Sequence, residues 1–139
     1  MNKKLLVTII ALGTIITICM VVLMFYARVL EKGNNLIVYA NCNVITDSDY
    51  SDWISNENFR KFQIVDDEIL QKENIYSEIK TSKDFELLSL KKVSITYDVT
   101  VKVQNLDSLE YIEEYKQELQ VVFVFKDFQW TVDSVEQGN

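Results

Sequence analysis

Tyr97 is the side chain whose spacing best suits acid–base chemistry. Between Val93 and Val103 apolar residues alternate with polar ones, and Tyr97 alone in the apolar row ends in a polar group. An inward tyrosine can donate a proton, but it more often fills a core with its hydroxyl hydrogen-bonded. The chain has no histidine, which excludes histidine-based acid–base or nucleophilic mechanisms and histidine-ligated zinc. We therefore predict that the protein is not an enzyme.

The acidic run DSDYSD at residues 47–52 resembles a calcium loop only in part. Asp52 stands where such a loop needs glycine, and Asn58 stands where it needs a bidentate glutamate. Thr46, Asp47 or Ser48 can instead cap the first turn of a helix. The three glycines, at positions 13, 33 and 138, form no phosphate-binding loop. We predict no metal and no cofactor, with calcium as the minor alternative.

A run of acidic residues is a second candidate surface, formed by Glu110, Glu113, Glu114 and Glu118. The simplest interpretation is a solvated face, and the alternative is a surface that binds a basic partner. Residues 33–139 carry twenty Asp and Glu against ten Lys and Arg, a formal net charge of −10. Nucleic acid repels such a surface, so we predict no nucleic-acid binding.

The segment from Leu5 to Tyr26 predicts a membrane anchor. It contains no charged residue, and as a helix its twenty-two positions span roughly 33 Å, close to the thickness of a hydrocarbon core. A cleavable signal peptide is the alternative, but the best cleavage triplet, at residues 38–40, lies well beyond the apolar run. We therefore expect residues 5–26 to cross the lipid bilayer uncleaved.

The flanks of this segment predict its orientation and the division of the chain. Lys3 and Lys4 precede it on a short tail, which favours a cytoplasmic amino terminus. We expect residues 1–32 to form a cytoplasmic tip and transmembrane anchor, and residues 33–139 an extracytoplasmic α+β domain. Cys42 is the only cysteine in that domain, so we expect a buried free thiol, with an intermolecular disulfide as the alternative.

Short helices are expected in the first half of this domain. Residues 36–45 fit both a strand and a helix, and we favour a helix. Tyr50, Trp53 and Ile54 fall on one helical face. A further helix is expected to begin at the acidic residues 66–68, with an apolar face formed by Ile69, Ile75 and Ile79.

Antiparallel strands are expected in the second half. Strict alternation predicts a strand over residues 93–103, with a shorter strand before it at 85–90 and a long strand at 111–125. A final hairpin with residues 126–127 as its loop would oppose three residue pairs: Phe125 and Phe128, Phe123 and Trp130, Val121 and Val132. The fold class is α+β, with a transmembrane helix followed by short helices packed on a curled antiparallel sheet.

Two regions of this chain resemble a known superfamily. The strand at 93–103 and the segment VFKDFQWTVDSV at 124–135 resemble bacterial extracytoplasmic members of the nuclear transport factor two-like (cystatin-like α+β cone) superfamily. The resemblance extends over about residues 36–136 and is most specific in its last quarter. It implies a cone-like fold that serves enzymes, small-ligand binders and membrane-tethered scaffolds of type IV secretion machines.

The chain is expected to be a membrane-anchored interaction or assembly module of the cell envelope, with another envelope protein as its partner and self-association left open. The alternative is a tethered domain with a small-ligand or enzymatic pocket, for which Tyr97, Phe123 and Trp130 are the candidate lining residues.

Overall fold

The computed structural model describes residues 2–42, 52–72, 75–108 and 110–138. It is an α+β structure that contains a long amino-terminal helix and a four-stranded antiparallel sheet. The chain forms two compact units, Met1–Lys32 and Gly33–Asn139, and each is described separately below.

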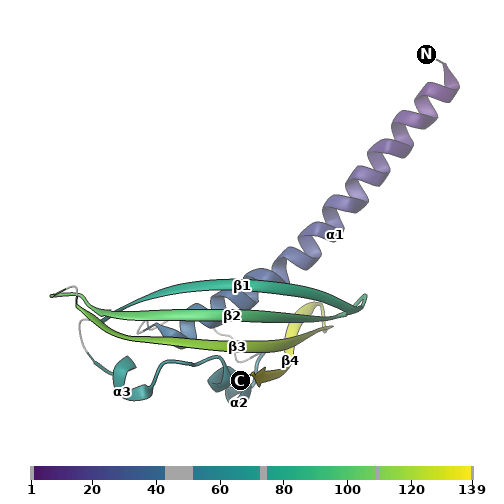
Figure 1. Ribbon diagram of the computed structural model, residues 1–139. Coiled ribbons are helices and arrows are strands. Elements are labelled where there is room, and N and C mark those ends of the chain that lie inside the picture. Colours follow the sequence, from purple (N-terminus) through teal and green to yellow (C-terminus); the bar gives the residue numbers. More distant parts are fainter. Residues whose placement is uncertain (1, 43–51, 73–74, 109, 139) are drawn as a thin grey trace. The chain divides into compact units, whose positions relative to one another are not determined.

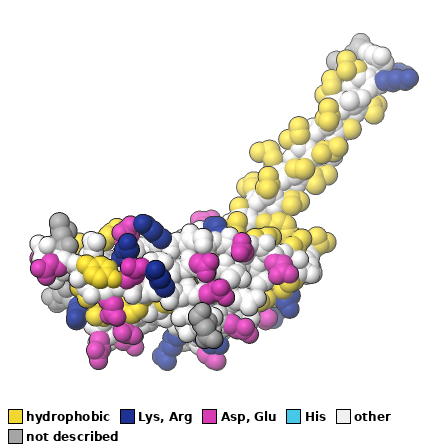
Figure 2. All heavy atoms as spheres, viewed as in Figure 1, with side chains coloured by type: hydrophobic (Ala, Val, Ile, Leu, Met, Phe, Trp, Pro, Cys, Tyr) yellow, Lys and Arg dark blue, Asp and Glu magenta, His cyan; other side chains and the backbone are white. Residues whose placement is uncertain are grey.

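Helix α1 runs from Lys3 to Asn41, and its residues up to Lys32 belong to the first unit. By length and composition it could cross a membrane. Side chains from Leu5 to Met24 are exposed, and Figure 2 shows hydrophobic groups around the visible surface of this stretch. Its threonine hydroxyls, at positions 8, 14 and 17, each donate to the backbone carbonyl four residues earlier. These groups are thus satisfied within the helix, as a lipid environment requires.

The sheet of the second unit is an antiparallel meander (Figure 1). Its strands, in spatial order, are β1 (Ile75–Ser89), β2 (Lys92–Asn105), β3 (Tyr111–Lys126) and β4 (Gln129–Gln137). Among the described strands, β1 and β4 are edges, so the sheet is open. The alternation that predicts a strand at 93–103 is confirmed, because the odd-numbered residues of β2 from Val93 to Val103 are buried. The predicted long strand at 111–125 is also confirmed.

The carboxy-terminal turns of α1, which belong to the second unit, form one layer of its core. Their buried residues recur at helical spacing and are Gly33, Leu36, Ile37, Ala40 and Asn41. In Figure 1 these turns pass behind the strands of the sheet. The favoured helix at 36–45 is therefore confirmed as far as Asn41, and residues 43–51, which include the predicted capping residues and Tyr50, lie outside the described residues.

Asn41 ties the end of α1 to the segment that follows α2. Its amide nitrogen donates to the carbonyl oxygens of Ile37 at 2.9 Å and Phe62 at 2.8 Å. Its side-chain oxygen accepts from the backbone N–H groups of Ile64 at 2.7 Å and Val65 at 3.2 Å. The side chain is fully buried, so these four bonds satisfy all of its polar capacity where water is excluded.

Two short helices differ from the expected ones. Helix α2 (Asn56–Lys61) begins after Ser55, whose hydroxyl accepts from the Asn58 N–H, so Trp53 and Ile54 precede the helix instead of lining its face. Helix α3 (Asp67–Leu70) begins at the acidic residues as predicted but is a single turn. The predicted continuation of its apolar face is wrong, because Ile75 and Ile79 lie in β1. A spacing of four residues suits one face of a strand as well as a helix.

The β3–β4 hairpin forms one residue later than predicted. Asp127 and Phe128 are its turn residues, with φ values of 52° and 62°. Phe125 therefore pairs with Trp130, and Phe123 pairs with Val132, so the predicted opposition of Phe123 and Trp130 is wrong. Both central residues of this tight turn adopt the left-handed conformation that Asn and Gly favour, and neither amino acid is present to reveal it.

Candidate functional site

Tyr97 lies in the core and its hydroxyl faces α1. The residue is fully buried, and within the described part of the chain its hydroxyl oxygen has no hydrogen-bond partner. A Cβ atom built at Gly33 would overlap this hydroxyl and lie 2.8 Å from the ring Cζ atom. Burial raises the pKa of Tyr97 well above its ordinary value. The group therefore remains a neutral phenol at physiological pH, able to donate a proton only to something that reaches the core.

The two aromatics grouped with Tyr97 as pocket candidates are also buried. Phe123 is fully buried and Trp130 is 2% exposed. The Trp130 ring meets the ring of Phe125 edge to face, with centroids 5.5 Å apart. The structure thus places all three candidates on the buried face of the sheet, where they contribute to the core.

The four predicted acidic residues do not share one face. Glu113 points to the helix side of β3, where the hydroxyl of Tyr115 donates to it at 2.9 Å. Glu114 and Glu118 point to the opposite face, and Glu110 precedes the strand. Glu114 also lies 3.4 Å from the Lys116 amine, an exposed contact of small energetic value. Burial, followed by the bond to Glu113 and nearby carboxylate charge, raises the pKa of Tyr115 to about 12.

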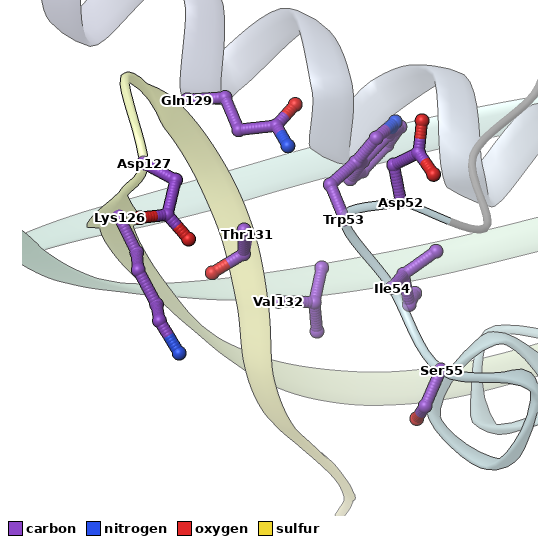
Figure 3. A pocket seen from close by; sticks show the side chains of 9 residues that line it. All are labelled: Asp52, Trp53, Ile54, Ser55, Lys126, Asp127, Gln129, Thr131 and Val132. Atoms are coloured by element: carbon purple, nitrogen blue, oxygen red, sulfur yellow. The ribbon is translucent and has the colours of Figure 1, made fainter.

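A cleft that the sequence did not indicate lies between the segment before α2 and the β3–β4 hairpin (Figure 3). Its volume is about 360 Å³. One wall is formed by residues 52–55, and the other by Lys126, Asp127, Gln129, Thr131 and Val132. The walls are joined where the Val132 N–H donates to the Trp53 carbonyl at 2.8 Å. This contact connects segments far apart in the sequence, so no local pattern signals it.

The lining of the cleft suits binding better than nucleophilic chemistry. Lys126 and Asp127 offer charges of both signs from the hairpin, and Asp52 lies on the opposite wall. The Ser55 hydroxyl already caps α2, so it is held away from a nucleophilic role. The described residues that line the cleft include neither cysteine nor histidine. A small polar ligand is the kind of molecule that this lining fits.

Metal ligands and a reactive thiol are two further kinds of site to consider. Over the described ranges, no three His, Cys, Asp or Glu side chains are grouped to hold a metal ion. The run at 47–52 resembles a calcium loop, and all of it except Asp52 lies outside the described residues. Cys42 is a partly exposed free thiol, and burial raises its pKa, which lowers its reactivity at neutral pH.

An exposed apolar strip lies on edge strand β1. Every residue of β1 from Lys80 to Ser89 is exposed, although Phe85 pairs with the buried Ile95 and Leu87 pairs with the buried Val93. Phe85 and Leu87 thus extend the apolar face of the sheet beyond its covered area, with 43% and 49% of their surfaces exposed. Because they lie on an edge strand, a chain that adds a strand to this edge could cover both side chains.

Comparisons of this chain with protein-family models, with curated proteins and with solved structures give no match.

Proposed function

We propose that this chain is a single-pass membrane protein whose residues 33–139 face away from the cytoplasm and bind another protein of the cell envelope. Helix α1 supports the anchor, because it is long and apolar enough to span a bilayer. Lys3 and Lys4 on a short tail support the orientation. The burial of Tyr97, Phe123 and Trp130 supports a binding role over an enzymatic one, because these aromatics fill the core.

The observation that carries the interaction role is the apolar strip on β1. As an edge strand within the described sheet, β1 has one row of backbone groups that no neighbouring strand occupies. A partner that adds a strand there would also cover Phe85 and Leu87. Lys83, Asp84 and Glu86 place charges along the same stretch, which disfavours unselective strand addition. The fitting partner is therefore a protein with an extended segment of complementary charge.

We infer a cone-like domain of the nuclear transport factor two-like type, and a role similar to that of membrane-tethered secretion scaffolds. The helix that precedes an antiparallel meander supports this inference. A tethered small-ligand domain is the second candidate, and the cleft beside Lys126 is the observation that favours it.

Photocrosslinking in the native membrane tests the interaction role. A photoreactive amino acid replaces Phe85 in the full chain, and the matched control carries it at Asp84, on the other face of the same strand. We expect position 85 to give a discrete crosslinked band that mass spectrometry identifies as a second protein, and position 84 to give little. Equal or absent crosslinking at both positions would contradict the proposed surface, and a band of twice the chain mass would identify self-association instead.

A further inference from the structure

Two turns of the second unit lie together at one end of the sheet. The β1–β2 turn contains Leu90 and Lys91, and the β3–β4 turn contains Asp127 and Phe128. They are adjacent because the Phe125 N–H donates to the Lys91 carbonyl at 2.8 Å, and Lys92 pairs with Val124. Figure 1 shows both turns at the same end, opposite the β2–β3 turn. We call these two turns and their flanking residues the turn end.

The turn end combines exposed apolar and cationic side chains. Phe128 is 97% exposed and Leu90 is 77% exposed. The two turns and their flanks carry three exposed lysines, at positions 91, 92 and 126, and one exposed carboxylate, Asp127. A second exposed carboxylate, Asp52, lies across the cleft from Lys126, so positive charge is still in excess. This local excess of positive charge belongs to a unit whose formal net charge is −10. Exposed apolar side chains next to lysine amines suit the boundary between lipid headgroups and acyl chains. The aliphatic part of a lysine side chain can also be buried there.

Phe128 lowers the stability of the isolated domain in two ways. Its φ of 62° places a bulky side chain in the left-handed region, which Gly would occupy without strain. It also exposes nearly its whole ring to solvent. A surface that receives the ring would offset both costs.

Chain connectivity limits the distance between the second unit and a bilayer that residues 5–26 would span. Only residues 27–32 separate the apolar run ending at Tyr26 from Gly33, and even fully extended this connection spans at most about 25 Å. A Cβ atom at Gly33 would lie 3.4 Å from the ring of Phe123, which pairs with Val93, next to the first residue of β2. The chain therefore enters the second unit in the half of the sheet that ends in the turn end.

We propose that the turn end rests on the bilayer that the anchor spans, with Leu90 and Phe128 inserted at the headgroup boundary. The lysines at 91, 92 and 126 then face lipid phosphates, whose negative charge attracts them. The proposal rests on the membrane anchoring proposed above. It assigns the turn end to lipid and leaves the β1 strip to a protein partner.

Depth-dependent fluorescence quenching tests the proposal on the full chain. In a Cys19→Ser, Cys42→Ser background, single cysteines at Leu90, Phe128 and, as the control, Asp107 in the opposite β2–β3 turn carry an environment-sensitive fluorophore. The chains are reconstituted in vesicles of phosphatidylcholine with 30% phosphatidylglycerol. Lipids spin-labelled near the headgroup act as quenchers.

We expect at least twofold stronger quenching at positions 90 and 128 than at position 107. Glutamine at the three lysine positions should weaken the quenching at 128, and no change would overturn the role of the lysines. Equal quenching at 107 and 128 in chains that float with the vesicles would overturn lipid contact while leaving the anchor intact. Chains that fail to float with the vesicles would instead overturn the anchor, and the lipid contact that depends on it.

Discussion

Gly33 lies directly against the hydroxyl group of Tyr97. A Cβ atom at residue 33 would overlap this hydroxyl and come within 2.8 Å of the ring carbon that bears it. Both residues are buried, so neither can move aside into solvent. The close approach of α1 to β2 within the second unit therefore depends on the absence of a side chain at Gly33.

Gly33→Ala should destabilise the domain although alanine favours helices. The helix-propensity gain is about 1 kcal/mol. Overpacking a fixed aromatic costs typically about 1–3 kcal/mol, and we expect that cost to prevail. Urea unfolding of the full chain in detergent micelles, followed by near-ultraviolet circular dichroism, measures the difference.

Tyr97→Phe provides the matched control for this contact. It removes a hydroxyl that is buried without a hydrogen-bond partner in the described part of the chain, so stability should stay equal or rise slightly. In the Gly33→Ala, Tyr97→Phe double variant, part of the alanine cost should disappear. Strict additivity of the two changes would show that the hydroxyl is not the obstacle.

Asn41→Ala should be among the most damaging single substitutions on α1. It leaves the backbone N–H groups of Ile64 and Val65 and the Phe62 carbonyl without their present partner. Each buried polar group left unsatisfied costs about 1–3 kcal/mol, so the total should reach about 3 kcal/mol or more. The same unfolding assay applies.

Asn34→Ala is the control for that substitution, seven positions earlier on the same helix. The Asn34 side-chain oxygen is buried but has no hydrogen-bond partner within the described residues. Its removal should therefore cost much less than the removal of Asn41. Similar losses for the two variants would contradict the bridging role assigned to Asn41.

Trp130→Ala should remove a large part of the core. Truncation of a buried tryptophan costs roughly 3–5 kcal/mol, a large share of the stability of an ordinary domain. Because Trp130 meets Phe125, a double-mutant cycle should give a larger coupling for this pair than for Trp130 with Phe123. Asp133→Asn, at an exposed position, should melt like the unmodified chain. Normal melting of Trp130→Ala would contradict its core role.

The parts of the fold that the sequence predicts are those with one wet face and one dry face. The alternation in β2 follows from burial of its odd-numbered residues from Val93 to Val103, so the sequence predicts this strand correctly. The strand predicted at 85–90 lies in the exposed part of β1 and is confirmed as far as Ser89. The beginning of β1 is missed, because the spacing of Ile75 and Ile79 also fits a helical face. The hairpin shift has a different cause, because Asp127 and Phe128 adopt a turn that their residue types disfavour.

The sequence predicts the candidate site less well than it predicts the strands. Strand parity correctly placed Tyr97 and Trp130 on the inner face, but parity does not say whether inner residues line a cavity or fill a core. The covering by residues 33–41 decides that, and it is a tertiary feature. The cleft beside Trp53 and the turn end both arise from segments distant in the sequence, which only the folded chain brings together.

Phe128→Gly should stabilise the domain by about 1 kcal/mol, because glycine adopts the left-handed turn conformation without the penalty that a side chain incurs. The measurement is the urea midpoint of the chain in micelles. Phe128→Ala is the control, since it shortens the side chain but keeps the Cβ atom, and it should gain little. Equal gains for both variants would show that the exposed ring, and not the backbone conformation, is the source of the cost.

The membrane orientation can be tested with single cysteines in a Cys19→Ser, Cys42→Ser background. Ser82→Cys lies on the exposed outer face of β1, and Asn2→Cys lies in the short tail before the apolar run. On intact cells, a membrane-impermeant maleimide should label residue 82, and it should label residue 2 only after permeabilisation. The reverse pattern would contradict the proposed orientation.

Release of the full chain by alkaline carbonate would contradict an integral anchor, and a released fragment that begins near Asn41 would support cleavage after residue 40.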